Sequence, residues 1–549
     1  MTDQIGQLST EFFEALMQAQ PTWAHMLGDY RFAGSFEECS REAEDRDIAV
    51  LRGFADRAEA IDAETLDDQQ RITRAVLSST ARTEADRLEA RLSELGADPI
   101  FGVQVEMPLV LGMLNVPTAD VADAMVSKLA GIGRHYEQLV ERQREGLAHG
   151  RVSARFAVDQ TVDQLEEALA VAPAEDALVT ASAAPDGIDE QDWRARMAQA
   201  VEQHVRPAMA AYRDVLRADV RLQARPDDRC GLSWLDGGED AYTRMLRYFT
   251  TTSRTARDIH ETGLRQVESL AEEYRALGPE VVGSGDLDTI FEAMRTDPAL
   301  HFETSGQLVD ASVKAMAKAH AAMRDWFDVL PKAPCEVEGT TTGAKAFYFP
   351  PAADGSRGGT FFINTTEPEG WGTFELEAMA YHEGIPGHHL QLSIAAELPD
   401  SIPDFRKHVH NSAYAEGWGL YSERLAEEMG LYTTPVDRMG MLSADSMRAC
   451  RLVVDTGIHA FGWSREQGVQ YMVSNSPLTE SVVRPEVDRY VVAPGQATSY
   501  MVGRLEIERM RREAEARTGF DLKRFHSAVL DSGSLPLDVL DEVVRARLG

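Results

Sequence analysis

The sequence predicts a mainly α-helical protein that carries one small β-sheet. Apolar residues recur at three- and four-residue spacing, with charged residues between them, over much of the 549-residue chain. This texture breaks at residues 334–368, where short aromatic and β-branched runs flank a turn-rich stretch. Because 44% of the residues are hydrophobic, the chain can bury a large core, which argues against an intrinsically disordered protein.

The helical pattern is clear in residues 69–95, QQRITRAVLSSTARTEADRLEARLSEL, and it recurs in segments 120–147, 189–224, 240–276 and 305–330. Two stretches break it and should connect helices: VAPAEDALVTASAAPDGIDE at 171–190 and LGPEVVGSGDLD at 277–288. We expect one unit over 1–549, with an N-terminal helical half over 1–285 and a second half over 286–549. The second half would hold the sheet and a group of helices at 374–425.

The runs AFYF and GTFFINT predict two strands joined by the turn-rich sequence PPAADGSRGG. The second run ends shortly before ELEAMAYHE, which begins a helix. An exposed edge on this strand could accept an extended peptide as an added strand. A hairpin with a purely structural role explains the same pattern equally well.

Charge and cysteine content narrow the function. The formal net charge is −35, which argues against a nucleic-acid partner or an anionic membrane surface, since both require a basic face. The four cysteines are far apart and predict no disulfide framework. The N-terminus lacks the pattern of a signal peptide, and no run of 18 apolar residues occurs. We therefore expect a soluble cytoplasmic protein, and a homodimer is left open.

The stretch YHEGIPGHHLQ at 381–391 resembles the start of a zinc-peptidase helix, in which a second histidine normally follows H-E at the fourth position. Here the next histidines are His388 and His389. Six residues turn a regular helix by roughly 600°, so His388 would face away from His382. His389 would share the face of His382 but lie roughly 10 Å along the axis. An uninterrupted helix therefore cannot bring either pair onto one metal ion.

Pro386 removes this obstacle, because a proline inside a helix clashes with the carbonyl four residues earlier, here that of His382. With glycines at 384 and 387, the helix should kink or bulge. A bulge that absorbs two residues would place His388 as the second ligand. His389 remains the alternative ligand, or a group that supports a ligand or contacts substrate.

A third ligand is expected from AYAEGWGLYSERL at 413–425, where Glu416 and Glu423 lie on one helix face. Glu416 would bind Zn²⁺, and Glu423 would orient a ligand histidine. Glu383 would then take a proton from the zinc-bound water and pass it to the leaving amine. An exposed acidic helix face with ion pairs is the simpler explanation of the two carboxylates alone.

Two later stretches offer groups that could stabilise the oxyanion or bind substrate. Their candidate residues are Arg451, Asp455 and His459 in RLVVDTGIHAFGW, and Arg489, Tyr490, Gln496 and Tyr500 in DRYVVAPGQATSYMVG. On a helix, the Asp455 carboxylate could orient the His459 imidazole. Arg451 or Arg489 could pair with the C-terminal carboxylate of a substrate. Each of these residues taken singly is more often structural.

Together the motifs HEGIPGHHLQ, YAEGWGLYSERL, RLVVDTGIHAFGW, RYVVAPGQATSYMVG and FHSAVLDSGSLPL resemble those of a bacterial family known only as domain of unknown function 885. That family is similar, at a distance, to helical zinc peptidases such as thimet oligopeptidase, angiotensin-converting enzyme and carboxypeptidase Taq. The resemblance implies a helical zinc-peptidase-like fold with two helical halves around a channel. It implies His382, His388 and Glu416 as ligands, Glu383 as base, and His459 and Tyr500 as stabilisers.

The function expected from sequence is thus a zinc-dependent hydrolase that cleaves short peptides, as a carboxypeptidase, dipeptidase or oligopeptidase. Two alternatives stay open. One is a non-catalytic helical protein that binds peptides or a metal ion. The other is a zinc hydrolase of non-peptide amides.

Overall fold

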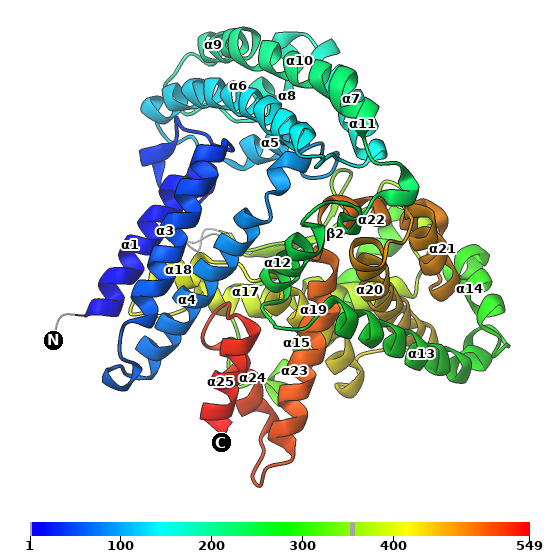
Figure 1. Ribbon diagram of the computed structural model, residues 1–549. Coiled ribbons are helices and arrows are strands. Elements are labelled where there is room, and N and C mark those ends of the chain that lie inside the picture. Colours follow the sequence, from blue (N-terminus) through cyan, green and yellow to red (C-terminus); the bar gives the residue numbers. More distant parts are fainter. Residues whose placement is uncertain (1–2, 352–356, 549) are drawn as a thin grey trace. The chain divides into compact units, whose positions relative to one another are not determined.

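The computed structural model describes residues 3–351 and 357–548, and helices dominate this part of the chain (Figure 1). One three-stranded sheet accompanies them, so the predicted mainly α fold is confirmed. The chain forms two compact units that alternate along the sequence. Unit 1 contains residues 3–61, 81–244 and 458–466, and unit 2 contains 62–80, 245–457 and 467–548.

The predicted division at residue 285 differs from these units. The first change of unit, between Ile61 and Asp62, lies in the connection after α3 (Arg41–Glu59), but the other four lie inside helices, so composition gives little sign of the boundary. Four helices contain such a change: α4 (Asp68–Glu89), α12 (Gly238–Thr250), α20 (Pro435–Phe461) and α21 (Arg465–Asn475).

Apart from one isolated β-bridge between Ala154 and Arg225, the regular elements among the described residues of unit 1 are helices. Its remaining α-helices are α1 (Gln4–Ala19), α2 (Pro21–Met26), α3 (Arg41–Glu59), α5 (Val103–Met113), α6 (Ala119–Ala148), α7 (Arg155–Ala170), α8 (Ala177–Thr180), α9 (Glu190–Ala200), α10 (Arg206–Val215) and α11 (Arg221–Gln223). Two π-helical turns, Val201–Val205 and Leu216–Val220, join α9, α10 and α11 into one continuous helix. This helix matches the predicted segment 189–224.

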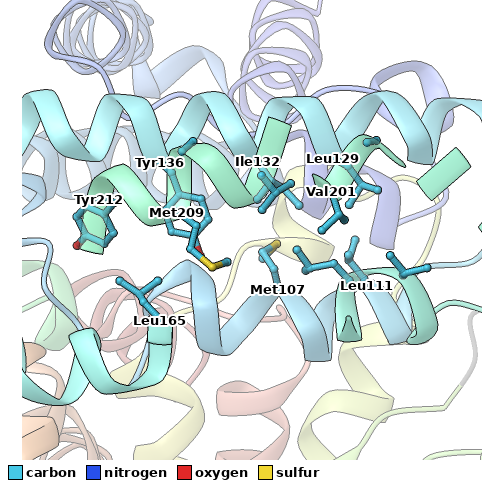
Figure 2. Packing of buried hydrophobic residues seen from close by; sticks show 14 of the residues in the cluster. Met107, Leu111, Leu129, Ile132, Tyr136, Leu165, Val201, Met209 and Tyr212 are labelled. Atoms are coloured by element: carbon cyan, nitrogen blue, oxygen red, sulfur yellow. The ribbon is translucent and has the colours of Figure 1, made fainter. Parts of the chain in front are cut away.

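The core of unit 1 forms around α6. Its buried apolar residues repeat at three- and four-residue spacing, which places Leu129, Ile132 and Tyr136 on one face. Figure 2 shows this face meeting Met107 and Leu111 of α5 and further side chains of α7 and α10. Burial of each large apolar side chain contributes roughly 1.5–3 kcal/mol, so this cluster accounts for much of the stability of unit 1.

Unit 2 contains the candidate site. Its remaining helices and strands are α13 (Ala256–Val281), α14 (Leu287–Thr296), α15 (Ser305–Trp326), β1 (Cys335–Thr340), β2 (Ala346–Phe349), β3 (Gly359–Asn364), α16 (Glu375–Glu383), α17 (His388–Ala396), α18 (Asp404–His408), α19 (Ser412–Glu428), α22 (Glu480–Val492), α23 (Ser499–Glu515), α24 (Leu522–Leu530) and α25 (Leu537–Leu548). Helices α19 and α23 lie side by side (Figure 1).

The predicted sheet at 334–368 is present, with strand order β1-β3-β2. β2 and β3 form the expected antiparallel pair, and β1 adds to β3 in parallel, with Cys335 opposite Gly359. The strand that precedes the motif helix is β3, and it is the central strand. The prediction that this strand has an exposed edge is therefore wrong, because both of its edges are hydrogen-bonded. The outer edges of the sheet belong to β1 and β2.

Two other predicted boundaries shift. Segment 240–276 is split between α12 and α13, because Thr251 has a positive φ of 49° and Thr255 starts α13 with a capping box. The expected break at 277–288 is shorter, since α13 continues to Val281 through Pro279. In contrast, α6 and α15 match segments 120–147 and 305–330 closely.

Candidate metal site

The motif helix is fully interrupted between His382 and His388. α16 ends at Glu383, and α17 begins at His388 after four residues that include a cis Ile385–Pro386 bond. The predicted bulge within one helix is thus replaced by two helices and a tight connection. Gly387 must be a glycine here, since a Cβ atom would lie 1.9 Å from the carbonyl oxygen of His382.

Helix α19 holds this connection in place. The indole N–H of Trp418 donates a hydrogen bond to the carbonyl oxygen of Pro386 at 2.9 Å, and the Ser422 hydroxyl donates to the same oxygen at 3.2 Å. Both donors are fully buried. The carbonyl that the broken helix leaves unpaired is therefore satisfied by the helix that carries Glu416.

Three side chains converge as predicted. Nε2 of His382 lies 3.5 Å from Oε2 of Glu416, and Nε2 of His388 lies 3.6 Å from the same oxygen. One ligand atom from each residue lies within 4.8 Å of the other two, and the two imidazole rings are nearly perpendicular, at 82°. The break after Glu383 brings His388 back toward His382, which a continuous helix could not do.

These distances fit a bound zinc ion. Zn–N and Zn–O bonds of about 2.1 Å in a tetrahedron place ligand atoms about 3.4 Å apart. The two spacings to Glu416, 3.5 and 3.6 Å, are close to this value and longer than ordinary hydrogen bonds of about 2.7–3.2 Å. Two imidazoles and one carboxylate are also a donor set that zinc uses in catalytic sites, where a fourth position stays open.

The electrostatics of the cluster favour positive charge at its centre. Burial opposes ionisation of Glu416, but His382 and His388 hold its pKa well below the usual value. Burial would likewise lower the pKa of His382, yet Glu416 and Glu423 outweigh this and raise it to about 9. A proton or a metal cation is therefore strongly stabilised between these groups.

Glu423 lies directly behind one ligand. Its Oε1 is 2.7 Å from Nδ1 of His382, so the ring donates its Nδ1 proton and leaves Nε2 to face Glu416. Glu423 is only 1% exposed, and Arg448 lies 3.8 Å from the same oxygen. The close approach of α19 depends on Gly419, because a Cβ there would lie 2.5 Å from Cε1 of His382.

Glu383 is half-buried and forms no hydrogen bond or ion pair with any other residue that the structure describes. It directly follows His382, and its charge acts on that imidazole. A carboxylate beside the three converging ligands that is not engaged elsewhere is available to exchange protons.

His389 points away from the cluster. Its Nδ1 lies 2.9 Å from the Tyr348 hydroxyl, and its Nε2 lies 3.1 Å from the carbonyl oxygen of Ala333. Burial lowers its pKa to about 4, so the ring is neutral near pH 7. These contacts tie α17 to the sheet, and His388 is the residue that joins His382 and Glu416.

Several of the C-terminal candidates form a second polar cluster around Glu486. Glu486 was not identified from the sequence. Arg451 Nη2, Arg489 Nη2 and the Tyr490 hydroxyl lie 3.0, 2.8 and 2.8 Å from Glu486 Oε2. Arg489 also donates to Gln496. Despite the burial of Glu486, the two guanidinium groups lower its pKa to about 2.

Tyr500 connects this second cluster with the first. The guanidinium carbon of Arg451 lies 4.5 Å from the centre of the Tyr500 ring. Burial and then the charge of Glu416 raise the pKa of Tyr500, so its hydroxyl stays protonated near neutral pH. The Tyr500 hydroxyl can therefore donate a hydrogen bond, and it lies within the electrostatic influence of Glu416.

Asp455 and His459 each contact a backbone N–H group. The Asp455 carboxylate accepts a hydrogen bond from the backbone N–H of Gly495 at 3.0 Å. His459 belongs to unit 1, where its Nδ1 accepts the backbone N–H of Leu232 at 3.2 Å and its ring stacks on Tyr242. The role of His459 at the metal site stays a prediction.

His410 is a further histidine that sequence reasoning missed. Its side chain is solvent-exposed, but the surrounding protein lowers its pKa, and both Glu416 and His388 act on it electrostatically. His410 therefore lies near enough to Glu416 and His388 for their charges to affect it. The only sequence signal was its place just before the helix that carries Glu416.

A family model matches residues 21–544, and its description is a bacterial protein of unknown function, DUF885. The chain belongs to the DUF885 family. A solved structure of a candidate lipoprotein from Colwellia psychrerythraea is similar to this DUF885 protein, with 25% identity, a TM-score of 0.90, and coverage of 99% of this chain and 98% of that one.

A second structure, from Shewanella oneidensis, is described as a candidate lipoprotein of unknown function. Its identity is 19%, its TM-score is 0.75, and the match covers 98% of the DUF885 protein and 99% of the other chain. No curated protein matches the sequence. Among the described residues, no helix is long and apolar enough to cross a membrane.

Proposed function

We propose that this DUF885 protein is a zinc-dependent peptidase that hydrolyses short peptides. The observation that carries the proposal is the convergence of His382, His388 and Glu416 at the spacing of zinc ligands. The unengaged carboxylate of Glu383 beside them adds the group that hydrolysis requires. When bound, zinc supplies a Lewis acid that polarises a carbonyl and lowers the pKa of water.

The remaining chemistry falls to side chains of this protein. Glu383 takes a proton from the attacking water and returns it to the amine that leaves. Tyr500, whose pKa is raised, stays protonated and donates a hydrogen bond to the oxygen that becomes negative as the carbonyl is attacked. Glu423 keeps His382 in the tautomer that presents Nε2 to the metal.

A peptide substrate is favoured by the sheet beside the motif. A cavity of about 870 Å³ lies between α15 and β1, and it reaches Ile385 and His389 at the helix break. Residues 335–338 of the edge strand β1 line it. An extended peptide can hydrogen-bond to such an edge, with its side chains alternating between the two faces.

The proposal is tested by incubating a mixture of short peptides with the zinc-loaded protein and with protein stripped by a chelator. Mass spectrometry then compares the products. Cleavage by the zinc form alone, restored when zinc is added back, supports the proposal. An intact peptide mixture despite a filled site contradicts it. That result would favour a hydrolase of non-peptide amides or a binding protein.

A further inference from the structure

We propose that Arg451 and Arg489 bind the C-terminal carboxylate of the peptide substrate, which makes the enzyme a peptidase of C-terminal residues. This inference rests on the proposed function and specifies its substrate. It follows from how the two guanidinium groups are held, from one buried donor atom that lacks a partner, and from the position of Tyr500.

The cluster around Glu486 carries more positive than negative charge. Arg451 and Arg489 both bond to a single carboxylate oxygen, Oε2 of Glu486. The other contacts of the two guanidinium groups are with neutral groups, namely the Tyr490 hydroxyl and the Gln496 side chain. Among these direct contacts two cations share one anion, and a substrate carboxylate would supply a second anion.

Arg451 has a donor that the protein leaves unused. The residue is 5% exposed, and its buried Nη1 atom has no hydrogen-bond partner in the described structure. A buried charged donor without a hydrogen-bond partner destabilises the fold. We therefore infer that the Nη1 atom of Arg451 hydrogen-bonds to a ligand. Nε and Nη2 of Arg451 are already engaged, which orients the guanidinium plane before any ligand arrives.

The cluster also lies close to the candidate metal ligands. Helices α19 and α23 are in contact where a Cβ on Gly417 would lie 2.6 Å from the Cα of Gly503, and Ser412 and Ser499 hydrogen-bond at 2.8 Å. Glu416 precedes Gly417 on α19, and Tyr500 follows Ser499 on α23. Tyr500 also packs against the Arg451 guanidinium, and the charge of Glu416 acts on it, so Tyr500 lies near both groups.

The position of Tyr500 near both groups bears on the cleavage position. An extended peptide advances about 3.3–3.6 Å per residue, so we expect a carboxylate bound at Arg451 to place a peptide bond close to the C-terminus beside Glu416. The protein should therefore release single residues or dipeptides from the C-terminus. An internal cut far from the C-terminus has no anchor in this arrangement.

The first test compares hexapeptides of mixed sequence, synthesised once as free acids and once as C-terminal amides. With zinc-loaded wild type, we expect kcat/KM to be about tenfold to a hundredfold higher for the acids, which is the range of a charged hydrogen-bonded contact. The fragments should end one or two residues before the original C-terminus. Equal rates for acids and amides, or cuts at internal bonds, would overturn the inference.

Variants provide the second test. Arg489→Gln should reduce the acid-to-amide ratio of kcat/KM toward one. Arg484→Gln is the matched control, because Arg484 lies on the same helix and pairs with Glu480, and it should keep the wild-type ratio. An unchanged ratio in Arg489→Gln, with a thermal midpoint like that of wild type, would contradict the assignment.

A binding measurement separates this inference from the proposed function. Calorimetry with the Glu383→Gln variant compares the same peptides as acids and as amides, without turnover. If wild type cleaves neither set but the acids bind at least tenfold more tightly, the carboxylate site stands and the peptidase proposal fails. If the acids bind no better than the amides, the carboxylate site is refuted whether or not peptides are cleaved.

Discussion

Oε1 of Glu423 lies 2.7 Å from Nδ1 of His382, and the carboxylate is almost completely buried behind the ring. The pair fixes which nitrogen of His382 carries its proton and which faces Glu416. A buried carboxylate behind a histidine raises the basicity of the ring and restrains its rotation. Under the proposed function, this contact would hold His382 in the tautomer and orientation that bind a metal ion.

Replacing Glu423 with Ala should therefore weaken zinc binding about tenfold to a hundredfold, which is typical of partners behind a metal ligand. The loss is read from competition with a zinc-sensitive dye. Glu427→Ala is the control, because Glu427 lies one turn further along α19, is partly exposed and pairs with Arg438. Equal zinc affinity in the two variants would show that Glu423 does not support the ligand.

The identity of the second histidine ligand can be tested directly. His388→Ala should leave the protein without bound zinc after dialysis, as should His382→Ala and Glu416→Ala. His389→Ala should keep its zinc, because His389 bonds to Tyr348 and the Ala333 carbonyl and faces away from the cluster. Metal analysis of each variant is the measurement, and zinc lost from His389→Ala but kept by His388→Ala would reverse the assignment.

Gly419 should be intolerant of even one added methyl group. A Cβ at this position would lie 2.5–2.9 Å from three atoms of the His382 ring, so Gly419→Ala must displace the ring or α19. We expect at least a tenfold loss of zinc affinity and a destabilisation of about 1–3 kcal/mol.

The control for this substitution is Gly306→Ala in α15, where a new Cβ would meet no atom within 4 Å. That variant should bind zinc normally, and its stability should rise slightly because alanine favours the helix. Wild-type zinc affinity in Gly419→Ala would show that the close approach of α19 is not needed.

Glu486 predicts how stability depends on pH. Its pKa is lowered from the usual 4.5 to about 2 in the folded protein, where Arg451 and Arg489 outweigh the effect of burial. The unfolded chain therefore binds this proton more readily, so the contribution is present above pH 4.5 and is lost as pH falls toward 2. Its size is about 3 kcal/mol.

Thermal unfolding of wild type and Glu486→Gln, followed from pH 7 down to pH 3, measures this contribution. Glu486→Gln should melt at a lower temperature than wild type at pH 7. This difference in melting temperature should decrease as the pH falls. If the difference in melting temperature between wild type and Glu486→Gln stays constant over this range, the two arginines do not lower the pKa of Glu486.

Much of the fold was predictable because it rests on local patterns. The apolar spacing of α6 and the short aromatic and β-branched runs of β2 and β3 are visible in the sequence itself. The division into units was not predictable, since the chain passes from one to the other within helices such as α4 and α20. The central position of β3 depends on β1, whose pairing is a long-range contact.

The candidate metal ligands were predictable for a similar reason. Pro386 and its flanking glycines predict a helix break, and this break allows His388 to lie near His382. No sequence pattern marks Glu486, because its role depends on hydrogen bonds from Arg451 and Arg489 that form only in the folded chain. His410 likewise gains importance only through neighbours that lie elsewhere in the sequence.

The most direct test of the central claim is mass spectrometry of a short-peptide mixture, incubated in parallel with zinc-loaded wild type and zinc-loaded Glu383→Gln. Because Glu383 is expected to transfer the protons and does not bind the metal, the variant should retain its zinc. It should cleave peptides about 10²- to 10⁴-fold more slowly than wild type. Cleavage by Glu383→Gln at the wild-type rate would contradict the mechanism.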